Sequence, residues 1–379
     1  MIFEDKERDD ETPMFYMEDE YDFLNRSSMP KAEVIRAFLN YWVQKFPEEE
    51  ARELVSRIKS GDSRHFDSSV FEIQLFAIMS GLKCKIEIHP TLSNDRKTKP
   101  DFLITTPDNE QFYLEAIVAS GMTEGEKGAQ KRIDTVLDAI NTLESHEFFL
   151  GVKANGNPDS PSSGRKLRRA LNAWIKTLNA DVIIENYRKV GYKAIPTKGW
   201  EQGGWKIEFE AIPKVPDKRK PGRLIGMQTA QAVWGSHANT IKMALEKKAS
   251  KYGKLDKPLV VATNIASIGV DSTDEMQALF GDEIFIFDKE TEQVRFAGRK
   301  PSGVWLDDRG DRYRRLSGAW IFRNLNVWNM VGAINTLYLN PKAYHEVPNV
   351  MLQVTHSIES GGEMRDVQGQ SIDILSQVD

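Results

Sequence analysis

The chain has 379 residues, with 51 Lys and Arg against 56 Asp and Glu and a formal net charge of −5. A single cysteine, Cys84, excludes an internal disulfide and suits a reducing compartment. The chain contains no secretory signal and no run of about eighteen apolar residues, so we expect a cytoplasmic protein without a membrane partner. The six histidines lack zinc-ligand spacing, and neither a phosphate-binding glycine-rich loop nor a nucleophile-elbow motif occurs.

The charge is distributed unevenly along the chain. Residues 1–28 hold ten acids and three bases, and residues 356–379 hold five acids and one base. The ends therefore carry −7 and −4, which leaves +6 for residues 29–355. Acidic ends with few core-forming residues predict disordered tails at 1–28 and 356–379. The basic remainder permits nucleic-acid binding.

The first ordered region is predicted to be helical, over residues 29–64, and a further helix covers residues 69–79. Glu72 lies on the apolar stripe of that further helix, three, four and seven residues from apolar side chains, and therefore points toward the core. Ser69 and Glu72 also fit a capping box, in which Glu72 folds back on the start of the helix. Both roles, a capping residue and an acid directed at a site, remain open from the sequence.

Two short strands with a turn between them follow, at residues 99–104 and 112–119. Residues 106–110 supply the turn formers of a hairpin. Each strand carries one acid in an apolar run, Asp101 in the first and Glu115 in the second. A carboxylate in such a strand is costly unless a cation or hydrogen bonds compensate it.

The length of the turn predicts the register of the hairpin. If Thr105 pairs with Gln111, Asp101 lies opposite Glu115 on one face of the sheet, because side chains alternate with period two. Two carboxylates on facing strands can hold a hard divalent ion between them. The same register places Lys99 opposite Ile117.

Beyond the hairpin, a helix is expected over residues 125–143 and a strand over residues 148–152, before a Pro/Ser/Gly loop at 156–164. The next helix opens with the basic cluster Arg165, Lys166, Arg168 and Arg169, which suits a phosphate backbone or forms an ordinary solvated face. Further helices and strands follow. The predicted fold is α/β, with a mixed central sheet flanked by helices, a core at 65–155 and a continuing α/β region at 156–355.

The order of elements in the core is helix with Glu72, strand, strand beginning Pro100-Asp101, strand with Glu115, helix, strand. This order resembles the PD-(D/E)XK superfamily, the restriction-endonuclease-like fold of metal-dependent nucleases, over roughly residues 65–155. The resemblance implies hydrolysis of DNA phosphodiester bonds, in restriction or phage defence, with Mg²⁺ or Mn²⁺ bound by Asp101 and Glu115. It implies Glu72 as a third acidic group. DNA is the expected partner, and a second copy of the chain or a defence-system protein are further candidates.

The chain departs from the family pattern at Ile117, where the family has a lysine that positions the attacking water. Lys99, opposite Ile117, is the predicted substitute, and Gln130 and Lys153 are alternatives. Three functions stay open: a nuclease, a nuclease-derived nucleic-acid-binding or scaffold protein without catalytic activity, and a hydrolase of another phosphate ester. Their common element is the pair Asp101 and Glu115.

Overall fold

The computed structural model describes residues 1–94, 98–156, 158, 160, 163–202, 204–220, 222–230, 236–287, 294–360 and 363–370. Contacts divide the chain into two compact units. Unit 1 comprises Met1–Glu11, Asp19–Gly121 and Gly235–Asp379, and unit 2 comprises Thr12–Glu18 and Met122–Trp234. Most of unit 2 is therefore an insertion of 113 residues into the sequence of unit 1. The predicted boundary at residue 155 differs, because the chain leaves unit 1 at Gly121 and returns to it at Gly235.

Unit 1 is built on a mixed sheet of eight strands in the order β1-β2-β3-β8-β13-β14-β15-β16. These strands are β1 (Lys85–Ile88), β2 (Phe102–Thr105), β3 (Gln111–Ala119), β8 (Leu259–Ile265), β13 (Leu316–Arg323), β14 (Asn335–Leu339), β15 (His356–Ser360) and β16 (Glu363–Val367). Four short strands form two separate pairs, β9 (Glu283–Phe287) with β10 (Val294–Arg299) and β11 (Leu306–Asp307) with β12 (Gly310–Asp311). The predicted α/β class with a mixed central sheet is confirmed.

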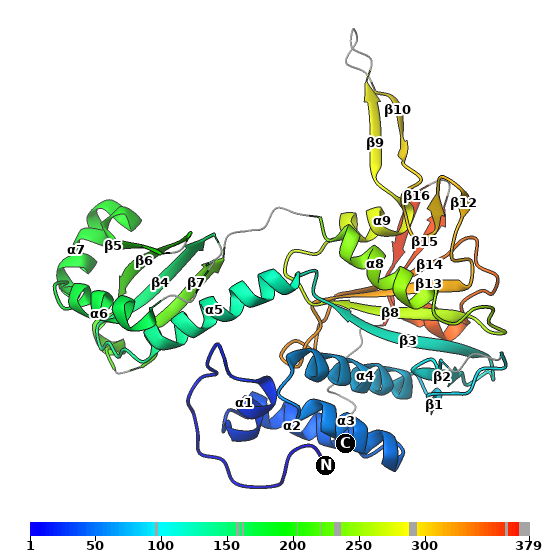
Figure 1. Cartoon of the computed structure of the whole chain (residues 1–379), viewed down its shortest axis with the longest axis horizontal. Helices are drawn as coiled ribbons and strands as arrows, with labels where there is room; N and C mark the ends of the chain where they lie inside the picture. Colours follow the sequence, from blue (N-terminus) through cyan, green and yellow to red (C-terminus); the bar gives the residue numbers. More distant parts are fainter. Residues whose placement is uncertain are drawn as a thin grey trace. The chain divides into compact units, whose positions relative to one another are not determined.

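Helices flank the sheet of unit 1 on both faces (Figure 1). They are α1 (Glu20–Arg26), α2 (Pro30–Val43), α3 (Glu48–Ile58), α4 (Ser63–Gly81), α8 (Ala238–Ala249) and α9 (Ser272–Phe280). Alternate residues of β3 supply two cores: Phe112 and Leu114 pack with the α4 side, and Tyr113 packs with the α8 side. The central strand β8 is buried along its whole length, as expected for a parallel strand covered on both faces.

Helix α4 begins six residues earlier than the sequence pattern predicts. Its N-cap is Asp62, whose side chain accepts a hydrogen bond from the backbone N–H of Arg64. Ser69 therefore lies inside the helix and is buried, so the predicted capping box of Ser69 and Glu72 is wrong. The helix therefore begins after the side-chain cap at Asp62 and not at Ser69.

The ends that were predicted to be disordered contain buried side chains and strands in the part of the chain that the structure describes. Ile2 and Phe3 are buried, and both of their backbone N–H groups donate to Oδ1 of Asn40, at 2.8 and 3.0 Å. At the other end, β15 and β16 extend the sheet of unit 1. A few apolar side chains anchor each end despite its acidic composition, and residues 371–379 lie outside the described part of the chain.

Unit 2 contains a sheet of four strands in the order β5-β6-β4-β7, with a core shared by that sheet and its helices (Figure 1). Its elements are α5 (Glu124–Asn141), β4 (Phe148–Asn155), α6 (Gly164–Ile175), α7 (Ala180–Val190), η1 (Gly191–Ala194), β5 (Thr197–Gln202), β6 (Trp205–Pro213), η2 (Pro216–Lys218) and β7 (Ile225–Ala230). The helix and strand predicted just after the hairpin are confirmed as α5 and β4. They belong to unit 2 rather than to the core that holds Asp101 and Glu115.

Across the described ranges of both units, no helix combines the length and apolar composition that a membrane crossing requires.

Candidate active site

The hairpin of β2 and β3 has the predicted register. Thr105 pairs with Gln111 and Phe102 with Leu114, which brings Asp101, just before β2, opposite Glu115. The backbone N–H of Asp101 donates to Glu115 Oε2 at 3.1 Å. The backbone N–H of Ala116 donates to Asp101 Oδ2 at 2.7 Å. These two bonds hold the carboxylates close together on the face of the sheet that α8 covers.

Glu115 is fully buried, with a relative exposure of 0%. Three side chains from the end of α8 and the turn after it donate to its carboxylate. Lys248 Nζ lies 2.5 Å and Lys251 Nζ 3.2 Å from Oε1, and the Tyr252 hydroxyl donates to Oε2. Spacings of three and four residues bring these donors to one face of the helix end, so that a single element neutralises the buried charge.

Asp101 is less completely buried, with a side-chain exposure of 18%, and Lys248 Nζ lies 3.9 Å from its Oδ2. Burial and the negative charge of Glu115 raise the pKa of Asp101 to about 7, against the opposing effects of Lys248 and the Ala116 N–H. Burial lowers the pKa of Lys248, but the charges of Asp101 and Glu115 outweigh it and the net pKa is raised. Lys248 therefore remains a cation at neutral pH.

Tyr252 remains a neutral hydrogen-bond donor in this cluster. Burial, followed by the charge of Glu115, raises the pKa of its hydroxyl far above the ordinary value. The same hydroxyl also donates to the carbonyl oxygen of Lys99 at 3.2 Å. Tyr252 thus links Glu115 to the backbone just ahead of Asp101 and fixes the orientation of both.

Glu72 lies near this cluster but is paired elsewhere. Arg57 of α3 binds both of its oxygens, at 2.9 and 2.7 Å. The charge of Glu72 still raises the pKa values of Asp101 and Lys248. Glu72 therefore contributes to the electrostatics of the site, while its own carboxylate is engaged by Arg57.

The structure does not bring the predicted cation, Lys99, to the carboxylates. Its side chain is exposed and forms no ion pair with Asp101 or Glu115 within the described residues. Strand β2 begins only at Phe102, so the period-two alternation that placed Lys99 on the same face does not extend back to it. Lys248 lies where the sequence analysis expected Lys99.

The two alternative candidates lie in unit 2 and have other partners. Gln130 donates to Asp134 at 2.8 Å. Lys153 lies 2.5 Å from Glu210, a buried glutamate that also accepts a hydrogen bond from the Tyr192 hydroxyl at 2.8 Å. Unit 2 therefore contains a Glu–Lys–Tyr group of its own, here called the Glu210 group.

The sequence analysis missed Lys248, although a signal for it exists. Ile241, Leu245, Lys248 and Tyr252 follow one another at spacings of four, three and four residues, so the lysine lies on the apolar stripe of its helix. A lysine on such a stripe needs a buried acid, and Glu115 is the acid that the hairpin provides. Because 113 residues of unit 2 separate the hairpin from this helix in the sequence, the two elements were not expected to be neighbours.

The donor atoms of the site fit a hard divalent cation. Asp101 and Glu115 offer carboxylate oxygens on neighbouring strands, which are the ligands that Mg²⁺ and Mn²⁺ prefer. The ammonium of Lys248 lies within 4 Å of both carboxylates, which shows that positive charge is stabilised between them. In the described ranges no group of three or more His, Cys, Asp or Glu is gathered. The protein would therefore supply two ligands, and water or substrate oxygens the rest.

The predicted basic cluster lies on α6 of unit 2. Arg165, Lys166 and Arg169 are exposed, whereas Arg168 is half-buried and donates to Thr142 Oγ1 at 3.0 Å. Unit 2 as a whole has 19 Lys and Arg against 14 Asp and Glu, a net charge of +5, and the rest of the chain carries −10. Binding of nucleic acid by this helix remains a prediction.

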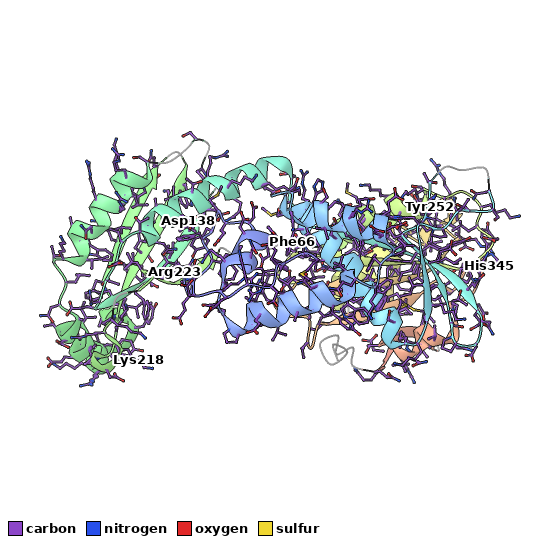
Figure 2. All side chains as sticks on the ribbon, turned by 90° about the horizontal axis from the view of Figure 1, so that it is seen from below. Phe66, Asp138, Lys218, Arg223, Tyr252 and His345 are labelled. Carbon is purple, nitrogen blue, oxygen red and sulfur yellow. The ribbon has the colours of Figure 1, made fainter. Side chains whose placement is uncertain are left out.

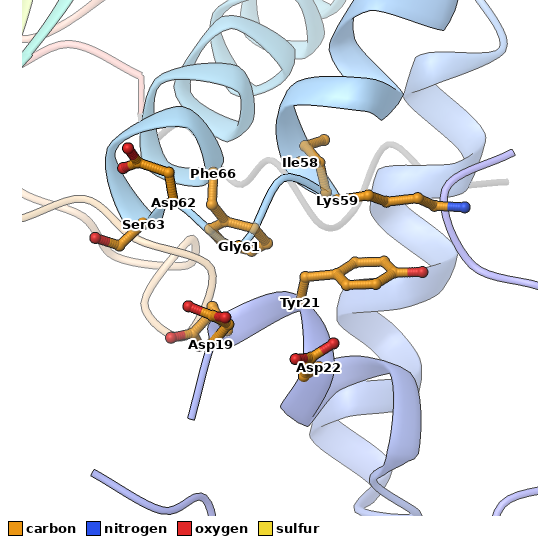
Figure 3. A pocket seen from close by; sticks show the side chains of 10 residues that line it. Asp19, Tyr21, Asp22, Ile58, Lys59, Gly61, Asp62, Ser63 and Phe66 are labelled. Atoms are coloured by element: carbon orange, nitrogen blue, oxygen red, sulfur yellow. The ribbon is translucent and has the colours of Figure 1, made fainter. Parts of the chain in front are cut away.

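A separate small pocket of about 60 Å³ lies between α1 and the turn from α3 to α4 (Figure 3). The carboxylates of Asp19, Asp22 and Asp62 surround it, and Asp62 is engaged by Arg64 at 2.7 Å. These acids disfavour a phosphate-bearing ligand. The pocket takes no part in the site formed by Asp101 and Glu115.

No family model, no curated protein and no solved structure matches this chain. The chemistry of the site is therefore inferred from its own side chains.

Proposed function

We propose that this protein is a metal-dependent nuclease that hydrolyses DNA phosphodiester bonds at Asp101, Glu115 and Lys248. The observation that carries the proposal is a pair of carboxylates that face each other in the hairpin, one fully and one largely buried, with a lysine ammonium within 4 Å of both. Phosphodiester hydrolysis needs a cation to stabilise the developing negative charge and ligands to hold it. Both requirements meet at this one position.

The arrangement of unit 1 supports the resemblance to the PD-(D/E)XK superfamily. The elements α4, β1, β2, β3, α8 and β8 follow one another once the inserted unit 2 is set aside. This is the same helix-strand-strand-strand-helix-strand order, with α8 and β8 in the places that the sequence analysis gave to the helix and strand that follow the hairpin. Asp101 lies just before the second strand of that order and Glu115 on the third. In this proposal Lys248, on the second helix of that order, supplies the cation that Ile117 cannot.

Each residue has a definite part in the proposed reaction. Asp101 and Glu115 would hold Mg²⁺ or Mn²⁺, and the bound ion would polarise the phosphate and lower the pKa of water. Lys248 is held in its charged form by the two carboxylates, so it stabilises a phosphate oxygen and orients the water rather than removing a proton. Tyr252 fixes the Glu115 carboxylate through its hydroxyl.

The basic insertion provides the proposed contact with the DNA backbone. Exposed Arg and Lys side chains at the start of α6 would neutralise phosphates, and such contacts position a substrate without reading its sequence. A role in restriction or phage defence follows from the resemblance and is part of the proposal.

One observation favours a second candidate, a nucleic-acid-binding or scaffold protein without catalytic activity. All the charges of the cluster balance without an added ion, because Lys248 and Lys251 match Asp101 and Glu115. Both oxygens of Glu115 already accept hydrogen bonds from protein donors. A purely structural cluster would have the same charge balance.

A cleavage assay separates the two candidates. Supercoiled plasmid and labelled single- and double-stranded DNA and RNA are incubated with the protein in Mn²⁺, in Mg²⁺ or in EDTA. The nuclease proposal expects cleavage with metal, none in EDTA, and loss of cleavage in Asp101→Asn. Lys247→Ala, an exposed change on the same helix, is the matched control and should retain full activity. Binding without cleavage by the wild-type protein would favour the second candidate.

A further inference from the structure

Unit 1 contains an open pocket of about 810 Å³ that begins one residue after Tyr252. It is lined by Gly253, Lys254, Leu255, Arg315, Tyr344 and His345. We propose that this pocket binds an unpaired nucleotide of the substrate strand, its phosphate on the basic side chains and its base on Tyr344. The proposal rests on the proposed nuclease function and deepens it, because it makes a strand with unpaired bases the substrate class.

The pocket has the charge that a phosphate requires. Among the residues that the structure describes, its lining contains no acid, although unit 1 as a whole is acidic. Arg315 Nη1 donates to the carbonyl oxygen of Gly253 at 2.9 Å, which holds the guanidinium beside the turn. Within the described residues this is the only hydrogen bond of the Arg315 side chain, so its other N–H groups remain available. Arginine with one anchored and several available donors is well suited to a phosphate.

Tyr344 provides a surface on which a base can stack. Its side chain is 65% exposed, and the guanidinium of Arg314 lies 4.6 Å from the centre of its ring. The backbone N–H of Tyr344 donates to the Arg314 carbonyl oxygen at 2.7 Å, and Arg314 Nε donates to the Lys342 carbonyl oxygen at 2.8 Å. The ring is therefore held in place while much of it remains open. Exposed aromatic rings beside basic residues are typical of single-strand binding sites.

The pocket is close enough to the candidate active site for one strand to reach both. Glu115 pairs with Val261, and Leu259, two residues earlier in β8, pairs with Leu316, the neighbour of Arg315. Two residues of strand rise and two strand spacings separate Glu115 from Leu316, together roughly 12 Å. Figure 2 shows Tyr252 and His345 at the same end of unit 1. A strand bound in the pocket would thus pass the carboxylates within a few nucleotides.

The pocket favours unpaired nucleotides over duplex DNA. A base in a duplex is stacked and paired on both sides, so it cannot lie on Tyr344 without being extruded. A strand end, a loop or a single strand offers its bases freely.

The test measures binding in EDTA, so that it does not depend on cleavage. Fluorescence anisotropy follows a labelled oligothymidine of roughly eight nucleotides, a length within the usual site size of such proteins. Tyr344→Ala should weaken binding by about 5-fold to 150-fold, whereas Tyr344→Phe, which keeps the ring, should bind as the wild type does. Replacing Lys254 and Arg315 with glutamine should each reduce the slope of log affinity against log salt by about 0.7.

Two controls make the result specific. Lys45→Ala removes an exposed charge from unit 1 at a cation–π pair with Tyr41, away from the pocket lining, and should leave binding unchanged. A duplex of the same length should lose less than about 2-fold on Tyr344→Ala, because its bases are not available for stacking. Equal losses for the duplex and the single strand, or no loss for either, would overturn the proposal.

The outcome is also separable from that of the proposed nuclease function. Metal-dependent cleavage by a Tyr344→Ala protein that binds oligothymidine normally would overturn the pocket and leave the nuclease intact. If the wild-type protein cleaves no substrate, and Tyr344→Ala loses the oligothymidine binding of the wild type, the pocket is supported and the nuclease proposal is overturned.

Discussion

The two units each bury a glutamate on a β-strand beside a lysine and a tyrosine, and the difference between these groups is informative. In unit 1, Glu115 is bound by Lys248 and Tyr252, and in unit 2, Glu210 is bound by Lys153 and Tyr192. Only Glu115 has a second carboxylate, Asp101, opposite it. The residues that pair with Glu210 on its neighbouring strands are Gly151 and Thr197.

The second acid changes the electrostatics of the group. Burial and Glu115 raise the pKa of Asp101, whereas the bonds from Lys153 and Tyr192 outweigh burial and lower the pKa of Glu210. A compensated Glu–Lys–Tyr group is therefore sufficient to stabilise a strand. The second acid, Asp101, with its raised pKa, is the feature of the unit 1 group on which the proposed cation site rests.

The largest expected difference between the groups is in catalysis. Asp101→Asn keeps the size of the side chain and an oxygen acceptor for the Ala116 N–H, but removes one of the two proposed anionic metal ligands. We expect metal-dependent cleavage to fall by at least about 10³-fold, since the cation carries most of the transition-state stabilisation. Glu210→Gln should retain cleavage within about 2-fold of the wild type, corrected for folded protein. Equal losses in both variants would place the chemistry elsewhere.

The second difference is in stability. Glu115→Gln removes the counter-charge that the half-buried Lys248 and Lys251 share, leaving only Asp101 beside Lys248, and should lower the free energy of unfolding by about 3–5 kcal/mol. Glu210→Gln leaves only Lys153, whose side chain is 47% exposed and can turn to solvent, so its cost should be smaller. Urea unfolding of both variants measures the two costs. A smaller loss for Glu115→Gln than for Glu210→Gln would contradict the charge pairing described for unit 1.

The hairpin site could be predicted from the sequence because its information is local. The turn between the strands sets the register, and the register alone brings Asp101 to Glu115. The lysine could not be found in the same way, because Lys248 reaches Glu115 across 133 positions of the chain. The segment that directly follows β3 forms a helix and a strand of unit 2. A helix and a strand are also the elements expected next in the core, so the sequence pattern assigned this segment to the core.

Two further misjudgements have the same physical origin. The prediction for Lys99 extended a strand beyond its true start at Phe102. The prediction of disordered ends weighed their charge and overlooked anchors such as Ile2 and Phe3, whose burial depends on distant parts of unit 1. The start of β2 and the burial of the chain ends both depend on tertiary contacts, which cannot be predicted from local composition.

The third prediction compares the lysines. Lys248→Ala should lower the turnover by roughly 10²-fold, because a fixed cation at the site of developing charge is lost. Lys251 and Tyr252 still bind Glu115 in that variant, so the fold should be retained. Lys153→Ala and Lys99→Ala should cleave like the wild type, and steady-state rates with saturating Mn²⁺ check all three. A strong loss of turnover in Lys99→Ala, with no loss in Lys248→Ala, would show that Lys99 and not Lys248 supplies the cation.

The fourth prediction concerns the dependence of stability on pH in EDTA. The raised pKa of Asp101, about 7, means that the folded protein holds a proton which the unfolded chain releases near pH 4. The contribution of Asp101 is therefore lost as the pH rises from about 4 to about 7, by at most about 1.4 kcal/mol per pH unit. The lowered pKa of Glu210 acts in the opposite direction, since its contribution is lost as the pH falls.

Urea unfolding between pH 4 and pH 8 tests this comparison. Against the wild type, Asp101→Asn should show a gentler fall of stability with rising pH, and Glu210→Gln a steeper one. Identical pH profiles for Asp101→Asn and the wild type would show that Asp101 titrates near its ordinary pKa.

The most direct test of the central claim, that Asp101 and Glu115 form a cation site, is the binding of Mn²⁺ by electron paramagnetic resonance at pH 8. The account predicts one Mn²⁺ bound per wild-type chain, little or none bound by Asp101→Asn, and wild-type binding by Glu210→Gln. Equal binding by the wild type and Asp101→Asn, or no binding by either, would contradict it.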